Sequence, residues 1–458
     1  MKKMNRVLVA NRGEIAVRII RACKELGIET IAVYSDADQD GLHVHLADKS
    51  VSIGPAPSRK SYLNIEKLIS VAIEERIDAI HPGYGFLAEN DEFSDACARN
   101  HICFIGPSGD IIRKMGNKIQ ARKAAVEAGV PVVPGTNEKN SDVEEFARAA
   151  HEIGYPVLLK AAAAGGGRGM KVVFDERELR NFYQQTQAEA AAAFGDGTVY
   201  IEKYIQNARH VEVQVLFDHY GNGIHLGERD CSIQRRHQKL IEEAPSPVLD
   251  SKMREEMHAA ALALAKSQNY TSAGTIEFVV DADSRKFYFI EMNTRVQVEH
   301  PVTEMLTGID IVKEQLRIAE GHKLSIEQRD VQFMGHAIEC RINAEDPFRG
   351  FMPMPGKIEH LHLPGGTGVR VDSHCYAGYS IPLYYDSLLG KLIVHGQDRE
   401  EAIVRMLRAL GEIDLKGIRT TVPFHERVLG NPDFRSGKYN TRWVEESFLH
   451  ELNKPVEV

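Results

Sequence analysis

Two patterns of hydrophobic and polar positions alternate along residues 6–115: short apolar runs and apolar residues at helical spacing. Short apolar runs at 6–10 and 30–34 are typical of buried strands, and apolar side chains at helical spacing over 14–26 predict a helix closed by Gly27. Another helical pattern covers 65–75, and it is followed by apolar runs at 79–81 and 103–106. Strands that alternate with helices predict a parallel sheet.

The first turn of this region does not suit a dinucleotide. Residues 11–14 read Asn-Arg-Gly-Glu, with one glycine where the phosphate-binding fingerprint needs three. Glu14 would also face a pyrophosphate at the helix N-terminus. We therefore interpret residues 6–115 as a scaffold. The loop at 81–87 follows a strand, where α/β sheets place ligands; Tyr84 is a candidate pocket residue there, and a structural turn is the alternative.

A different pattern, with a period of two, runs through residues 287–301. Five polar side chains recur at every second position, namely Glu291, Asn293, Arg295, Gln297 and Glu299. In an extended chain they share one face, and Ile290, Met292, Val296 and Val298 share the other. A solvated strand face is the alternative interpretation of the same pattern.

The residues before this segment predict a hairpin with two strands at 273–281 and 286–291. A turn centred on Ser284 pairs Val279 with Phe289 and also pairs Glu277 with Glu291. Two carboxylates directly opposite each other repel. A divalent cation between them removes that cost, and Mg²⁺ takes oxygen ligands from protein, phosphates and water.

Three further stretches carry candidate phosphate-binding chemistry. A predicted helix at 117–130 has Lys118 in its first turn, and two predicted strands flank the glycines at 165–169, with Lys160 at the end of the first strand. Such a loop offers backbone N–H groups to phosphate oxygens, although many glycine runs are only mobile hairpins. Residues 228–243 are densely charged; Arg235, Arg236, His237 and Lys239 form either a triphosphate-binding cluster or a solvated turn.

Composition narrows the classes of function. The 458 residues are enough for two to four domains, and 43% of them are hydrophobic. The net charge of −9 argues against a protein that coats nucleic acid or anionic membranes. We find no apolar run of spanning length and no export signal, and the six cysteines show no Cys-x-x-Cys spacing. These features predict a cytoplasmic protein with reduced cysteines, and we interpret Cys231 as an ordinary buried residue.

Several long motifs in the same order resemble the biotin carboxylase family of the ATP-grasp superfamily over nearly the whole chain. They are Ala10-Asn-Arg-Gly-Glu-Ile-Ala, His81-Pro-Gly-Tyr-Gly-Phe-Leu, Gly227-Glu-Arg-Asp-Cys-Ser-Ile-Gln-Arg-Arg-His-Gln-Lys, Glu291-Met-Asn-Thr-Arg-Val-Gln-Val-Glu-His-Pro-Val-Thr-Glu and Glu339-Cys-Arg-Ile-Asn-Ala-Glu-Asp-Pro. The resemblance implies an α/β and α+β multidomain fold. Its parts are a pre-ATP-grasp α/β domain at 1–115, an ATP-grasp domain at 116–331 with a lid near 133–204, a mixed α+β domain at 332–446 and a tail at 447–458.

The resemblance also implies a set of site residues. Metal ligands would be Glu277, Glu291 and Asn293, for Mg²⁺ or Mn²⁺ in two sites. ATP would contact Lys118, Lys160, Gly166, Gly167, Glu202, Lys203, Tyr204, Ile205, His210, Gln234, His237, Glu277 and Glu291. Bicarbonate would bind Lys239, Arg295, Gln297 and the Val298 backbone, with Glu299 as the base. Biotin would meet Tyr84 and Arg341, and Arg341 with Arg295 would stabilise its enolate.

The reaction implied is the carboxylation of biotin by ATP and bicarbonate, through carboxyphosphate, as the first half-reaction of acetyl-CoA carboxylase in fatty acid synthesis. A carboxylase for pyruvate or another acyl-CoA, another bicarbonate-using ATP-grasp ligase and a non-catalytic nucleotide-binding module are the alternatives. The chain lacks a Met-Lys-Met attachment motif, so biotin is expected on a separate carrier protein. A carboxyltransferase component and a homodimer through Arg18, Arg21 and Glu25 are the other expected partners.

The chain departs from the family pattern in the glycine loop, where Ala163 and Ala164 stand in the glycine run. Alanine does not adopt positive φ cheaply, so we expect a stiffer loop that affects ATP affinity more than chemistry. Met354, where a serine is common, is expected to be neutral.

Overall fold

The computed structural model describes residues 3–136, 142–161, 170–194 and 197–452. The chain divides into two compact units. The first comprises Met1–Val130, Arg209–Val279 and Glu291–Val458, and the second comprises Pro131–Ala208 and Val280–Ile290. The mixture of parallel and antiparallel sheets with helices confirms the predicted α/β and α+β fold class.

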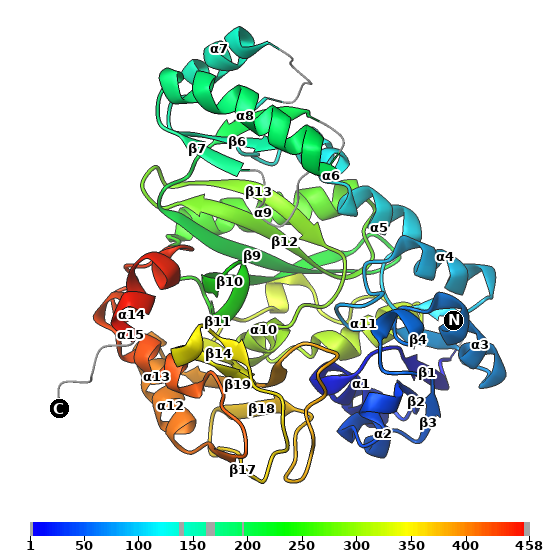
Figure 1. Ribbon diagram of the computed structural model, residues 1–458. Coiled ribbons are helices and arrows are strands. Elements are labelled where there is room, and N and C mark those ends of the chain that lie inside the picture. Colours follow the sequence, from blue (N-terminus) through cyan, green and yellow to red (C-terminus); the bar gives the residue numbers. More distant parts are fainter. Residues whose placement is uncertain (1–2, 137–141, 162–169, 195–196, 453–458) are drawn as a thin grey trace, which may run out of the picture. The chain divides into compact units, whose positions relative to one another are not determined.

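A five-stranded parallel sheet in the order β3-β2-β1-β4-β5 opens the first unit. Its strands are β1 (Arg6–Val9), β2 (Glu29–Tyr34), β3 (Lys49–Ser52), β4 (Ala79–His81) and β5 (Cys103–Phe104). The helices in this part of the chain are α1 (Gly13–Glu25), α2 (Leu42–Leu46), α3 (Ile65–Glu74), α4 (Asp91–Arg99), α5 (Gly109–Gly116) and α6 (Lys118–Glu127). Figure 1 shows α1 beside β1. The sheet confirms the predicted parallel succession, whereas α2, β3, α4 and α5 were not anticipated.

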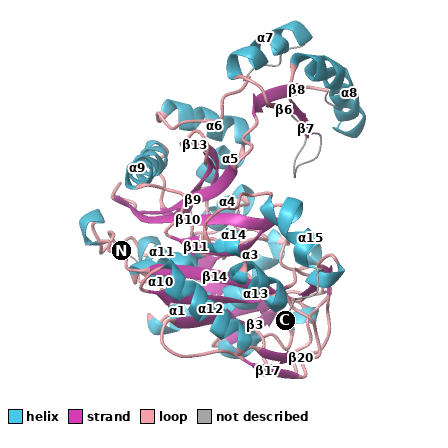
Figure 2. Ribbon diagram, turned by 90° about the vertical axis from the view of Figure 1, so that its left-hand side faces the viewer, coloured by secondary structure: helices cyan, strands magenta, loops and turns pink. Residues whose placement is uncertain are grey.

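The chain also forms an eight-stranded sheet in the order β13-β12-β9-β10-β11-β14-β19-β18, drawn in magenta in Figure 2. The strands are β9 (Ala208–Phe217), β10 (Gly223–Arg235), β11 (Gln238–Ala244), β12 (Ser272–Asp281), β13 (Lys286–Asn293), β14 (His336–Asn343), β18 (Val369–Ser373) and β19 (Leu388–Gly396). The expected domain boundary at 331/332 falls between β11 and β14, which pair directly.

Helices and short sheets complete this unit. The helices are α9 (Ser251–Ser267), α10 (His300–Thr307), α11 (Ile311–Ala319), α12 (Arg399–Gly411), α13 (Val422–Gly430), α14 (Pro432–Arg435) and α15 (Leu449–Leu452), with a π-helical turn at Val444–Phe448. The two-stranded sheets are β15 (Glu345–Asp346) with β16 (Met352–Pro353) and β17 (His360–His362) with β20 (Asp414–Lys416). The helix predicted at 398–410 begins after Asp398, whose side chain accepts from the Glu401 N–H. Phe424, Phe434 and Trp443 are buried in the hydrophobic core that this helix shares with β14, β19 and the other C-terminal helices.

The second unit is a small α/β structure. Its three antiparallel strands are β7 (Met170–Val173), β6 (Val157–Ala161) and β8 (Val199–Lys203), in that order, with helices α7 (Val143–Ile153) and α8 (Glu176–Phe194). Phe146, Leu159 and Ile201 are fully buried in its core. The structure confirms the two strands predicted on either side of the glycine loop, and the loop itself lies outside the described residues.

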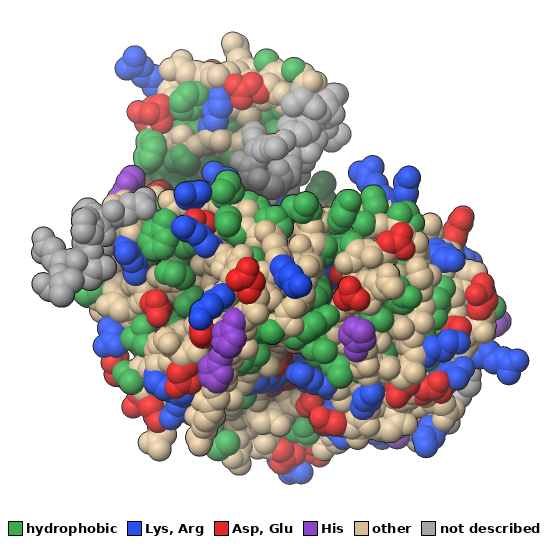
Figure 3. Space-filling view, turned by 60° about the horizontal axis from the view of Figure 1, so that its bottom comes forward, with side chains coloured by type: hydrophobic (Ala, Val, Ile, Leu, Met, Phe, Trp, Pro, Cys, Tyr) green, Lys and Arg blue, Asp and Glu red, His purple; other side chains and the backbone are tan. Residues whose placement is uncertain are grey.

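Surface properties match the composition. Lysine, arginine and acidic side chains are interspersed on the face shown in Figure 3, without a large area of one sign. In the described ranges, no helix combines the length and the hydrophobicity needed to cross a membrane.

Candidate active site

The polar row at 291–299 begins in a strand and ends in a turn. β13 stops at Asn293, the chain bends at Arg295, and α10 starts at His300. The extended conformation therefore ends at Asn293, where the chain leaves the sheet to enter the helix. Neither face is solvated there, since Val296 is 0% and Glu299 is 2% exposed. Before the bend, by contrast, Ile290 is 42% exposed despite its place on the predicted apolar face.

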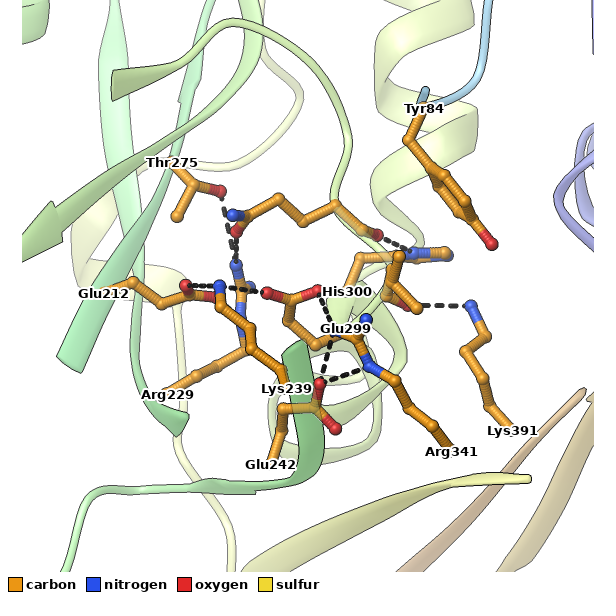
Figure 4. Close-up of polar contacts among 12 residues, drawn as sticks. Tyr84, Glu212, Arg229, Lys239, Glu242, Thr275, Glu299, His300, Arg341 and Lys391 are labelled. Carbon is orange, nitrogen blue, oxygen red and sulfur yellow. Dashed lines mark hydrogen bonds and ion pairs between the residues drawn. The ribbon is translucent and has the colours of Figure 1, made fainter. Parts of the chain in front are cut away.

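Glu299 lies between two cations at the N-terminus of α10 (Figure 4). The Lys239 ammonium donates to its Oε1 over 2.6 Å, and the Arg341 guanidinium donates to its Oε2 over 3.0 Å. Burial raises the pKa of the Glu299 carboxyl, but these cations outweigh burial and lower it overall. The sequence left this balance open. The structure places an ionised carboxylate here at neutral pH.

Lys239 on β11 joins three carboxylates. Its Nζ lies 2.5 Å from Glu212, 3.1 Å from Glu277 and 2.6 Å from Glu299. Glu212, on β9, was missed by sequence reasoning. Burial opposes ionisation of Glu212, but Lys239 and Arg229 hold its pKa well below the usual range. A buried ammonium is tolerated here because three acids surround it.

Arg229 on β10 is the second residue that sequence reasoning missed. Its fully buried guanidinium donates to five acceptors, Glu212 Oε1, Gln214 Oε1, Thr303 Oγ1, Thr275 Oγ1 and Gln297 Oε1, over 2.7–3.2 Å. The Gln297 side chain also donates to Glu277 over 2.8 Å. Arg229 therefore orients a predicted bicarbonate ligand. The available signal was an arginine at a buried strand position, which needs an anionic partner.

Arg341 on β14 binds a second carboxylate as well as Glu299. Its Nε donates to Glu242 Oε1 over 2.6 Å. Burial raises the pKa of Glu242 to about 7, even though Arg341 lowers it. The sheet register places Glu339 opposite Glu242, and neither oxygen of Glu339 has a hydrogen-bond partner within the described residues. Burial raises the pKa of Glu339 well above its ordinary value, which favours the protonated form of this carboxyl.

The predicted metal ligands lie close to one another. The Asn293 amide donates to Glu277 Oε1 over 2.8 Å. Burial, followed by the negative charge of Glu277, raises the pKa of Glu291. The charge of Glu277 disfavours ionisation of the half-buried Glu291, and a divalent cation with oxygen ligands would relieve that repulsion. His210 Nε2 lies 3.1 Å from Glu277, and ligand atoms of His210, Glu212 and Glu277 gather within 4.8 Å of one another.

Arg295 has partners that the sequence did not indicate. Its Nε donates to Glu89 Oε2 over 2.8 Å, and its Nη2 donates to Asn293 Oδ1 over 2.8 Å. Glu89 follows the loop that carries Tyr84. The arginine is thus fixed between the N-terminal sheet region and the predicted metal ligand.

The charged stretch at 228–243 is a β-hairpin with a solvated turn at its tip, and its predicted cations do not form a single cluster. Residues 228–234 are buried in β10, and Arg236 and His237 form an exposed turn with φ of 48° and 63°. Arg235 lies over the Phe351 ring and donates to the Gly350 carbonyl over 3.0 Å. Alternation along the hairpin separates these side chains, and Lys239 alone of the four predicted cations reaches the carboxylates. Gln234 is 8% exposed at the end of β10.

In the second unit, Lys160 on β6 forms an ion pair with Glu202 on β8. The Lys203 ammonium donates to the Gly154 carbonyl over 2.8 Å, and its backbone N–H donates to Pro134. Tyr204 and Ile205 follow β8 directly. The predicted phosphate contacts Gly166 and Gly167, together with Ala163 and Ala164, lie outside the described residues.

Tyr84 and Cys231 both have acidic side chains as neighbours. The Tyr84 hydroxyl donates to the buried Glu14 carboxylate. Cys231 is buried, as expected, and its Sγ lies within 4.8 Å of carboxylate oxygens of Glu212 and Glu299, so this cysteine also borders the candidate site. Burial raises the pKa of its thiol well above the ordinary value, which keeps it protonated.

Three family models cover most of the chain. They are described as "Biotin carboxylase, N-terminal domain" at residues 3–112, "Carbamoyl-phosphate synthase L chain, ATP binding domain" at 117–327 and "Biotin carboxylase C-terminal domain" at 339–446. Biotin carboxylase 1 of Bacillus subtilis is 58% identical over 442 residues, which is 96% of this chain and 98% of that protein.

Solved structures are similar along the full length. The biotin carboxylase domain dimer of 2-oxoglutarate carboxylase from Hydrogenobacter thermophilus, in complex with MgADP, ADP and bicarbonate, is 50% identical with a TM-score of 0.89, covering 99% of this chain and 100% of that one. A biotin carboxylase complex with β,γ-ATP from Campylobacter jejuni is 52% identical with a TM-score of 0.89, covering 96% and 98%.

Proposed function

Because the chain belongs to the biotin carboxylase family, we propose that it carboxylates biotin on a carrier protein, consuming ATP and bicarbonate and releasing ADP and phosphate. The observation that carries the proposal is Glu299, a buried carboxylate kept ionised between Lys239 and Arg341. A base of this kind is suited to removing the proton of bicarbonate, and general-base catalysis contributes about 10²- to 10⁴-fold.

ATP is the phosphoryl donor in this proposal. Lys118, Lys160, Gly166 and Gly167 bind its phosphates, and Glu202, Lys203, Tyr204, Ile205, His210, Gln234 and His237 contact adenine or ribose. Mg²⁺ or Mn²⁺, held by Glu277, Glu291 and Asn293, offsets negative charge on the transferring phosphoryl group. The raised pKa of Glu291 beside Glu277 supports that assignment, because a cation relieves the repulsion between the two carboxyls.

Bicarbonate binds among Lys239, Arg295, Gln297 and the Val298 backbone. Glu299 takes its hydroxyl proton, an oxygen attacks the γ-phosphorus, and ADP leaves. The resulting carboxyphosphate divides into CO2 and phosphate. Phosphate then takes the N–H proton of biotin, and the enolate nitrogen bonds to CO2. Arg341 and Arg295 stabilise that enolate. Arg229, which fixes Gln297, keeps the amide oriented toward the anion.

Two protein partners and a second copy of the chain complete the proposal. Biotin arrives on a biotin carboxyl carrier protein, and a carboxyltransferase component passes the carboxyl group to acetyl-CoA in fatty acid synthesis. Pyruvate, 2-oxoglutarate or another acyl-CoA is the alternative acceptor. The acceptor binds the separate carboxyltransferase component, so the residues of this chain do not determine its identity. For the homodimer, Arg21 and Glu25 are exposed on α1, whereas Arg18 is buried in ion pairs with Glu304 and Asp310. Arg18 therefore offers less exposed surface to a second copy than Arg21 and Glu25 do.

The experiment is bicarbonate-dependent phosphate release from ATP, measured with and without free biotin. Biotin should increase the rate, which distinguishes this reaction from that of a carbamoyl-phosphate type ligase. Glu299→Gln should reduce the rate by about 10²- to 10⁴-fold. Full activity in that variant would exclude Glu299 as the base, and absence of bicarbonate-dependent release in the unmodified protein would leave a nucleotide-binding module.

A further inference from the structure

A fully buried lysine lies directly beneath the segment that carries Glu299. Lys391, on β19, has a side-chain exposure of 0%. Its Nζ donates to the Val298 carbonyl over 2.7 Å, which Figure 4 shows as a contact approaching from the side opposite Glu212. The same Nζ lies 3.0 Å from Glu14 Oε1, the oxygen that also accepts from Tyr84.

The contact with Val298 constrains Glu299 through the backbone. The Val298 carbonyl belongs to the peptide group that joins Val298 to Glu299, and that group is planar. The preceding carbonyl, of Gln297, contacts the His300 ring nitrogen over 2.7 Å. Two successive peptide groups that lead into the base are therefore held by side chains. Glu299 itself has no side-chain capping bond to α10, so its carboxylate depends on these backbone contacts and on its cations.

A buried ammonium costs more free energy than a neutral donor would to hydrogen-bond one carbonyl. Moving an ion out of water costs several kcal/mol, which only a partner charge and good hydrogen bonds offset. Lys391 has Glu14 from α1 as an ion-pair partner, and the register places it opposite Arg341 and Asp372. A buried charge at this position calls for a role beyond packing.

We propose that Lys391 is a positioning residue, anchored by Glu14, which holds the Val298–Glu299 peptide and so sets the Glu299 carboxylate between Lys239 and Arg341. The inference rests on the proposed role of Glu299 as the base. It assigns Lys391 no contact with substrate. Its effect on the reaction passes through Glu299.

A double-mutant cycle on the full chain tests this role, with bicarbonate-dependent phosphate release as the assay. Lys391→Met should reduce kcat about 100-fold, the scale of a misplacement of roughly 1 Å. In the Glu299→Gln background the same substitution should reduce kcat no further, because no carboxylate base is left to position. If the two losses multiply independently, or if Lys391→Met alone keeps full kcat, the positioning role is wrong.

A matched control separates positioning from general stability. Arg399 is a half-buried cation, 2.6 Å from Glu243 and unconnected to Glu299. Arg399→Met should lower the urea midpoint and leave kcat near that of the unmodified chain; an equal loss of kcat would count against Lys391. Should Lys391→Met not fold, Glu14→Gln replaces it in the cycle, with a smaller loss that also vanishes beside Glu299→Gln. Full activity of Glu299→Gln alone would instead remove the assigned base and leave Lys391 nothing to position.

Discussion

Arg229 offers a test of whether burial or the number of ion pairs decides stability. Arg229→Met removes a 0% exposed guanidinium and leaves Glu212 buried with Lys239 as its remaining strong cation partner. Breaking a buried pair from one side costs about 3–5 kcal/mol. The orphaned Gln214 and Gln297 oxygens each add a penalty of about 1 kcal/mol or more, without strict additivity. We expect a loss of at least about 3 kcal/mol, a large share of a typical 5–15 kcal/mol.

Arg113 provides the comparison. It contacts three carboxylates, Asp91, Asp95 and Asp110, over 2.7–2.8 Å, but its side chain is 49% exposed. Arg113→Met should leave unfolding close to that of the unmodified chain, because water and salt screen exposed pairs. Urea unfolding can follow the fluorescence of Trp443, the single tryptophan, which is buried in the C-terminal core. A midpoint for Arg229→Met no lower than that for Arg113→Met would refute this reasoning.

Three further substitutions have defined outcomes. Burial raises the pKa of Glu242 from 4.5 to about 7, so the folded state binds more protons than the unfolded state, and stability falls as pH rises through that interval. Glu242→Gln should lack this fall in urea midpoints between pH 5 and 8. An unchanged fall would contradict the assignment. Glu291→Gln should raise the Mg²⁺ concentration for half-maximal ATP cleavage, and an unaltered metal requirement would remove Glu291 as a ligand. Gly335→Ala should lower the melting temperature more than Gly129→Ala, because both have positive φ but the Gly335 Cβ would lie 2.1 Å from the Gly396 carbonyl; equal shifts would show that the strand relaxes.

Local patterns predicted the elements well and the site in part. The helix closed by Gly27, the parallel strands and the glycine-flanking strands follow from periodicity and turn chemistry, which act over a few residues. Glu277 and Glu291 could be brought together from the sequence because one hairpin joins them. The sequence could not decide whether the chain bends after Asn293, since strict alternation of polar residues continues through a turn whose shape depends on α10 and on the residues that pack against it.

The contacts that define the site join distant parts of the chain. Lys239 meets Glu212 and Glu299, Arg229 meets Gln297, and Lys391 meets Glu14, and each pair is brought together by sheet order that no local pattern encodes. Motif resemblance supplied Lys239, Arg341 and Glu299. It did not supply Glu212, Arg229 or Lys391, because those side chains act on other side chains and the backbone around the base.

The pairing of β11 with β14 has a consequence for dividing this protein into pieces. A fragment that ends at residue 331 would keep Lys239 but lose Arg341, and it would present β11 as an unpaired edge. The complementary fragment would begin with the opposite bare edge, and such edges invite aggregation. Gene fusions, split reporters and domain exchanges should therefore leave 331/332 intact, since half of the base's immediate surroundings lies on each side of that junction.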